Sequence, residues 1–195
     1  MTIDTGFRVQ TLAAALTEWM PVASEQRELR LEYLDFLDAR GASALARDGG
    51  PQHLTASCFV FTPKLTHTLL CFHKKGRFWV QLGGHIEADD ASVASAALRE
   101  AREESGLAGL TLIDDELTNP TPYDLNRHAL AAAFGRCATH WDVGYVALAE
   151  ADATPEVSAE SEAVAWWPID ALPSQLPDRF GDRLHTALGE LRARS

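Results

Sequence analysis

Three glutamates lie close together near the middle of the sequence, at positions 100, 103 and 104 of the stretch Arg-Glu-Ala-Arg-Glu-Glu-Ser-Gly. At about 100° of rotation per residue, a helix would place Glu100, Glu103 and Glu104 on one face. Like charges with this spacing destabilise an exposed helix by about 0.2–0.5 kcal/mol per pair. A divalent cation would offset the repulsion, because carboxylate oxygens are ligands that Mg²⁺ prefers. The pattern indicates a metal-binding face, and a solvated surface helix is the alternative.

A glycine pair and an acidic loop precede this helix. From Arg99 to Leu107 the chain resembles the second half of the Nudix hydrolase signature, which runs Gly, five residues, Glu, seven residues, then Arg-Glu-apolar-any-Glu-Glu-any-Gly-apolar. The first half departs from the signature. The sixth residue after Gly84 is Asp90 instead of Glu, and eight residues instead of seven separate it from Arg99. This signature region, the Nudix box, extends here from Gly84 to Leu107. It keeps the spacing of its glutamates but has a shorter first acid and one extra residue.

The resemblance to Nudix hydrolases implies a fold and a chemistry. The fold is an α/β/α sandwich with a mixed β-sheet. The activity is hydrolysis of a nucleoside diphosphate linked to another moiety, with Mg²⁺ or Mn²⁺ as cofactor. The implied metal ligands are the carbonyl of Gly84 and the side chains of Glu100, Glu103 and Glu104. Glu103 and Glu100 are also catalytic candidates, one of the glutamates doubling as general base, and Arg99 would orient Glu103 from one helical turn away.

A second acidic cluster, Glu156, Glu160 and Glu162, precedes the sequence Ala-Trp-Trp-Pro. In several Nudix enzymes a glutamate from the segment before a similar tryptophan completes the site as base or extra ligand. By this resemblance Glu160 is the candidate for a further catalytic residue, with Glu162 next. The alternative is a solvated acidic loop.

Basic residues and histidines near the box are candidates for substrate contacts. Lys75 and Arg77 precede the strand that enters the box, where they could meet phosphates. A basic hairpin tip is the alternative. His85 lies inside the box loop, and a three-histidine zinc site could be drawn from it together with His128 and His140. Their spacing matches no compact zinc motif, so structural or substrate-contacting histidines are favoured.

Composition limits the classes of protein that are compatible with the chain. A net charge of −11 argues against a broad nucleic-acid surface, which needs a basic footprint. No apolar run approaches the roughly 18 residues that would span a membrane. The N-terminus lacks the basic start and apolar stretch of a secretory signal, so we expect a cytoplasmic protein. The three cysteines have no paired spacing, and Cys58 and Cys71 lie in apolar runs typical of buried thiols.

The order of the predicted elements fits a mixed α/β fold. Hydrophobic periodicity predicts helices at 9–19, at 25–37 or slightly beyond with a break at 38–41, at 91–105 and at 178–192. The β-rich runs are 54–63, 67–73, 77–82, 110–113, 128–134, 143–149 and 163–167, and the gap at 63–66 suits a hairpin. Strands before, between and after helices suggest a mixed sheet with helices packed on it.

These patterns predict a Nudix domain at residues 51–195 after an N-terminal helical extension at residues 1–50. The extension would cover one edge of the sheet or build a homodimer interface. We expect a pyrophosphohydrolase acting on a small nucleoside diphosphate derivative.

Two other functions are compatible with the sequence. One is a non-catalytic nucleotide-binding sensor, which the altered first half of the box favours and the intact glutamates disfavour. The other is a relative of isopentenyl diphosphate isomerase, whose chemistry relies on a cysteine and a glutamate facing each other across the substrate. Cys71 and Cys137 are available for that role, but no surrounding motif supports either.

Overall fold

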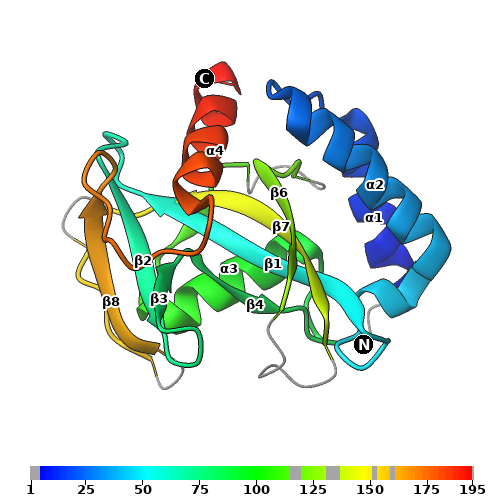
Figure 1. Ribbon diagram of the computed structural model, residues 1–195, viewed down its shortest axis with the longest axis horizontal. Coiled ribbons are helices and arrows are strands. Elements are labelled where there is room, and N and C mark those ends of the chain that lie inside the picture. Colours follow the sequence, from blue (N-terminus) through cyan, green and yellow to red (C-terminus); the bar gives the residue numbers. More distant parts are fainter. Residues whose placement is uncertain (1–4, 115–119, 131–136, 151–152, 159–160, 195) are drawn as a thin grey trace.

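The computed structural model describes residues 5–114, 120–130, 137–150, 153–158 and 161–194. Figure 1 shows a central sheet with helices on both of its faces and along one side. The helices are α1 (Thr5–Glu18), α2 (Ser24–Arg40), the 3₁₀ helix η1 (Gly41–Ala44), α3 (Val93–Ser105) and α4 (Phe180–Arg194). The strands are β1 (Gln52–Phe61), β2 (His67–His73), β3 (Phe78–Val80), β4 (Leu82–His85), β5 (Thr111–Leu112), β6 (Asp124–Ala129), β7 (Thr139–Leu148) and β8 (Ser161–Pro168).

Strand β1 is the centre of the sheet. It runs parallel to β7 over its whole length, from the pair Gln52↔Thr139 to the pair Phe61↔Leu148. The other side of β1 pairs with β4 at its N-terminal half and with β2 at its C-terminal end, both antiparallel. Strands β3 and β8 pair with β2, while β5 and β6 pair with β7. The sheet is therefore mixed, as predicted.

Alternation along β1 sends successive side chains to opposite faces of the sheet. Leu54, Ala56, Cys58 and Val60 belong to the hydrophobic core that includes α3. Phe59 and Phe61 belong to a second core, built with α4. Because α3 and α4 cover opposite faces, the sheet lies between two helical layers. This arrangement confirms the predicted α/β/α sandwich.

The N-terminal helices α1 and α2 lie side by side next to β6 and β7 (Figure 1). The ring of Phe36 stacks on Trp141 of β7, with centroids 4.3 Å apart. Gln26 completes the hydrogen bonding of edge strand β6, since its amide accepts from the Leu125 N–H at 2.8 Å and donates to the Leu125 carbonyl at 3.0 Å. The helices thus cover one sheet edge, which is how an exposed edge is commonly protected. The homodimer stays a prediction.

Most of the predicted boundaries differ from the structure by a few residues; for example, α1 begins at Thr5 instead of residue 9 and β7 at Thr139 instead of residue 143. The predicted strand 77–82 is divided at Gln81, because β3 pairs with β2 whereas β4 pairs with β1. Helix α2 ends at Arg40, within the predicted break at 38–41, and Gly41, with φ of 50°, follows as its C-cap. The predicted strand 128–134 begins earlier, at Asp124, because its polar residues have buried partners; residues 131–136 lie outside the described part of the chain.

Within the described residues, no helix is both long enough and apolar enough to cross a membrane.

Candidate active site

Helix α3 carries the box glutamates, and both of its ends are fixed by local chemistry. At the start, the Ser92 hydroxyl accepts from the Ser95 N–H at 3.0 Å, and the Ser95 hydroxyl accepts from the Ser92 N–H at 2.7 Å. This reciprocal capping satisfies two N–H groups that the helix leaves unpaired. At the end, Gly106 adopts a φ of 70°, which glycine tolerates best. The helix packs against β1 and β4, and its buried apolar residues are Val93, Ala94, Ala96, Ala97, Leu98 and Ala101.

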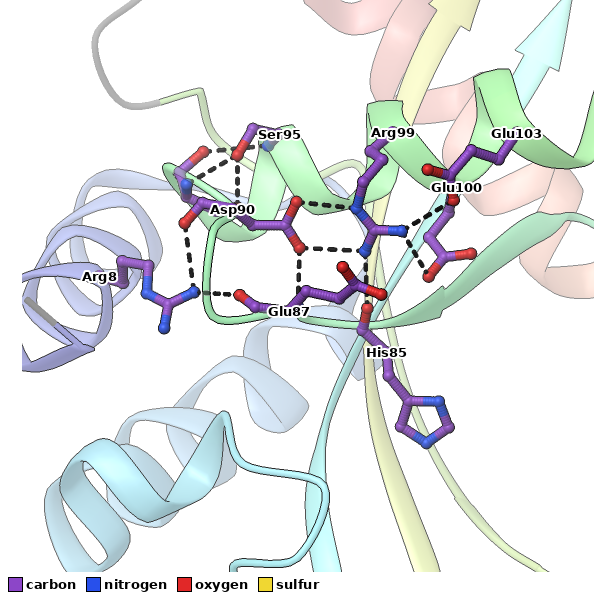
Figure 2. Close-up of polar contacts among 9 residues, drawn as sticks. Arg8, His85, Glu87, Asp90, Ser95, Arg99, Glu100 and Glu103 are labelled. Carbon is purple, nitrogen blue, oxygen red and sulfur yellow. Dashed lines mark hydrogen bonds and ion pairs between the residues drawn. The ribbon is translucent and has the colours of Figure 1, made fainter. Parts of the chain in front are cut away.

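Arg99 is the centre of a polar network at the N-terminal half of α3 (Figure 2). Its Nε and Nη2 donate to the two carboxylate oxygens of Asp90 at 2.9 and 3.0 Å. Nη2 also donates to the His85 carbonyl at 2.9 Å. Nη1 lies 3.1 Å from Glu100 and 3.0 Å from Glu103. Hydrogen bonding to Asp90 is the main cause that raises the pKa of Arg99 above its ordinary value. Arg99 therefore stays charged and holds two box glutamates side by side.

The box loop between β4 and α3 is held from two directions. Asp90 accepts from the Glu87 N–H at 2.8 Å, which closes a tight turn within the loop. Arg8 of α1, which is 4% exposed, donates through Nη1 to the Glu87 carbonyl at 2.6 Å and the Asp90 carbonyl at 3.2 Å (Figure 2). The role of Arg8 was not predicted from the sequence, because its partners lie about 80 positions away and no local pattern marks the contact.

The glycine pair at the end of β4 adjoins two of the glutamates. A Cβ atom placed on Gly84 would lie 2.7 Å from the Glu100 carboxylate carbon, so any larger residue there would displace that carboxylate. The Gly83 N–H donates to Glu104 at 2.8 Å. Glu104 is 7% exposed, and the Cys71 thiol lies 3.7 Å from one of its carboxylate oxygens. Glu100, Glu104 and the backbone of Gly84 thus gather at one place.

Glu103 differs from the other two glutamates in its exposure. Its side chain is 61% exposed, compared with 13% for Glu100. Carboxylate and carbonyl oxygens near one another are the donor set that a hard cation such as Mg²⁺ prefers. The oxygens of the box, including the Gly84 carbonyl, therefore fit such a cation by their chemistry.

The isomerase alternative needs a cysteine and a glutamate on opposite sides of a substrate, but Cys71 and Glu104 are in direct contact with each other. Burial is the main cause that raises the pKa of the Cys71 thiol, and the residue is 1% exposed. A reaction across a substrate requires that the substrate lie between the two groups. The direct contact of Cys71 with Glu104 does not favour this chemistry. Cys137 lies elsewhere, beside His53.

Two of the candidates for substrate binding, Lys75 and Arg77, lie between β2 and β3. Lys75 is exposed in the turn between β2 and β3. Arg77 forms an ion pair with Glu162, and its guanidinium lies 5.0 Å from the centre of the Phe72 ring. Arg77, a candidate for substrate binding, and Glu162, a candidate for the catalytic site, are therefore paired with each other. Glu160 lies outside the described residues.

The side chain of His85 points away from Arg99 and Glu100, although its carbonyl takes part in the network (Figure 2). Its ring instead lies 5.1 Å from the ring of His53 and 5.4 Å from that of His140. Burial is the main cause that lowers the pKa of His85 to about 4 and of His140 to about 3. His53 had no local signal in the sequence, because it meets the other two only through strand pairing.

The fold and the box define a Nudix protein. The chain matches the NUDIX domain family over residues 51–187 and belongs to this family. None of the curated proteins compared with the chain matches it. A Nudix-family hydrolase from Clostridium perfringens is 25% identical, with a TM-score of 0.55 over 73% of this chain and 98% of the other.

Two further structures share the fold. The Ap4A hydrolase of C. elegans, in a binary complex, is 15% identical, with a TM-score of 0.55 over 72% of this chain and 98% of the other. The E. coli dihydroneopterin triphosphate pyrophosphohydrolase is also 15% identical, with a TM-score of 0.53 over 68% of this chain and 92% of the other.

Proposed function

We propose that the protein hydrolyses the diphosphate linkage of a nucleoside diphosphate joined to another moiety, with Mg²⁺ or Mn²⁺ as cofactor. The observation that carries the proposal is the gathering of Glu100 and Glu104 around Gly84, with Glu103 held beside them by Arg99. A protein that only binds a nucleotide has no evident need for three carboxylates at this spacing. Members of the Nudix family are hydrolases of such linkages, and the chain belongs to that family.

The residues of the box would have different roles in the reaction. The Gly84 carbonyl, Glu100, Glu103 and Glu104 are the groups that would hold the cation. When bound, the cation neutralises the diphosphate, polarises its phosphorus–oxygen bonds and lowers the pKa of an attacking water. Arg99 keeps the Glu103 carboxylate in a defined position, and the exposure of Glu103 lets it reach a water and accept its proton.

Other assignments in this proposal rest on the sequence alone. Lys75, Arg77 and His85 as substrate contacts and Glu160 as an additional base or ligand stay predictions. The cytoplasmic location and the homodimer also stay predictions. The substrate is a small nucleoside diphosphate derivative, because the net charge of −11 disfavours a nucleic-acid surface.

The proposal is tested by phosphate or nucleotide release, with Mg²⁺ and with Mn²⁺, from ADP-ribose, nucleotide sugars, dinucleotides and nucleoside triphosphates. Glu103→Gln is assayed on the same panel. We expect metal-dependent cleavage that Glu103→Gln lowers by roughly 100-fold or more, because loss of a positioned acid–base group alone costs about 10²–10⁴-fold. The exposed position of Glu103 predicts that the variant stays folded.

The alternative function, a nucleotide sensor, makes a different prediction in the same experiment. A sensor would release no product from any compound on the panel. It would still show a rise in melting temperature with one of these compounds, because ligand binding to the native state stabilises it. The network around Asp90 weakens this alternative, since the altered residue of the box still pairs with Arg99.

A further inference from the structure

Four histidines form a row on one face of the sheet, in four neighbouring strands. His140 of β7 is paired with His53 of β1 and with His128 of β6. His85 of β4 lies opposite Thr55, two residues along β1 from His53. Residues in register share a face of the sheet, and so do residues two apart on one strand. Strand pairing therefore brings together side chains from positions 53, 85, 128 and 140 of the sequence.

Three of the four rings converge. Each of His53, His85 and His140 has a ring nitrogen that lies within 4.8 Å of a ring nitrogen of the other two. His53 is fully buried, and His85 and His140 are half-buried. The fourth histidine is engaged differently, since its Nδ1 lies 3.0 Å from the amide nitrogen of Asn126.

The three converging rings have few hydrogen-bond partners. His53 meets the Cys137 thiol, with Sγ 3.6 Å from Nδ1. Within the described ranges of the chain, the rings of His85 and His140 make no hydrogen bond to another residue. An ion placed between the rings would use nitrogen lone pairs of His85 and His140 that no other residue in the described part of the chain occupies.

We propose that His53, His85 and His140 bind a divalent metal ion such as Zn²⁺, at a second site distinct from the box glutamates. Imidazole nitrogen suits Zn²⁺, and three histidines with an open fourth position are an established zinc donor set. At a Zn–N distance of about 2.0–2.1 Å, a tetrahedral site needs nitrogens about 3.4 Å apart. The observed nitrogens lie within 4.8 Å of one another, so binding an ion requires rotations that draw the three rings closer together.

The second site differs from the box in ligand chemistry and in direction. The box offers oxygen donors, which Mg²⁺ prefers, whereas the histidines offer nitrogen donors. The His85 ring points away from Arg99 and Glu100 (Figure 2). The proposal therefore does not depend on the hydrolase function. A bound ion would tie β4, β1 and β7 together, directly beside the glycine pair of the box.

Cobalt and zinc titrations test the site in the full-length protein after metal removal. A large excess of Mg²⁺ is present throughout, so that the carboxylates are occupied. We expect the wild-type protein to bind one Co²⁺ per chain with the visible absorption of a four-coordinate ion, and Zn²⁺ to displace it and raise the melting temperature. His85→Asn and His140→Asn should weaken Zn²⁺ binding by roughly 100-fold, because each removes a direct ligand.

His185→Asn is the matched control. His185 lies on α4, and its ring contacts the Gly181 carbonyl instead of another histidine. Its replacement should leave Zn²⁺ affinity unchanged. The proposal is overturned if the wild-type protein binds neither Co²⁺ nor Zn²⁺ under these conditions, or if His85→Asn and His140→Asn bind Zn²⁺ like the control. X-ray absorption of the zinc-loaded wild type gives a test without variants: three imidazole ligands support the site, and a shell of oxygen alone contradicts it.

Discussion

Arg99 and Asp90 form a two-pronged ion pair, with nitrogen–oxygen distances of 2.9 and 3.0 Å. The pair exists although the acid is one methylene shorter than the glutamate of the Nudix signature and lies one residue further from the arginine. Asp90 also accepts from the Glu87 N–H, so one carboxylate connects the loop to the helix. Asp90 therefore contacts both Arg99 and the loop backbone, although the first half of the box departs from the signature.

Asp90→Asn should lower both stability and turnover. The substitution removes the negative charge and one of the two oxygens that accept from Arg99, whose side chain is 23% exposed, and we expect a loss of about 1–3 kcal/mol in the free energy of unfolding. Turnover should fall because the position of Glu103 depends on Arg99. Urea unfolding and steady-state kinetics measure the two effects. Asp90→Glu keeps the charge and is expected to lose less of both; equal urea midpoints for wild type and Asp90→Asn would refute the structural role.

Arg8→Ala should reduce turnover, although Arg8 lies on a helix outside the region matched to the family. Arg8 holds two carbonyls of the box loop, so its loss frees the loop that precedes Arg99. Arg27→Ala is the matched control, because Arg27 also donates to two carbonyls but within the N-terminal segment, at Pro21 and Val22. We expect Arg8→Ala to lower kcat several-fold more than Arg27→Ala. Equal kcat values in the two variants would contradict a specific role of Arg8.

Gly84→Ala should displace Glu100. The added methyl group would lie 2.7 Å from the Glu100 carboxylate, closer than a real Cβ contact allows. We expect weaker Mg²⁺ binding, seen as a higher Mg²⁺ concentration for half-maximal activity, and lower turnover. The melting temperature should change only modestly, because the carboxylate can rotate aside. Gly109→Ala serves as the control, since a Cβ atom added there would have no heavy atom within 4 Å. Wild-type Mg²⁺ dependence in Gly84→Ala would argue against this metal position.

Only one of the three thiols should react in the native protein. Burial raises the pKa of Cys58 to about 12 and also raises that of Cys71, so the reactive thiolate is scarce at neutral pH and the sulfur is inaccessible. Cys137 is partly exposed. Titration with a thiol-reactive disulfide at pH 8 should count one thiol in the native protein and three after denaturation. Rapid reaction of two or more in the native state would disagree with the buried positions.

The box helix and its chemistry could be predicted from the amino-acid sequence. Hydrogen bonds between neighbouring turns fix the geometry of any helix, so the spacing predicted that Glu100, Glu103 and Glu104 share one face. The burial of Glu104 against Gly83 was not predictable in this way, because it depends on the strand that lies beside the helix. Gly106 marked the helix end for an equally local reason. The short β-rich runs similarly predicted the strands of the sheet, although the division at Gln81 depended on which neighbouring strand each half pairs with.

Contacts between distant segments were set by the folded arrangement of the whole chain. Arg8 reaches the box loop, Gln26 completes the edge of β6, and His53 meets His85 and His140 because of strand register. Register is set by how whole strands bury their apolar faces, and a shift of one residue would turn every side chain to the other face. Local spacing along the chain carries no information about that choice, because the partners of each strand lie far away in the sequence.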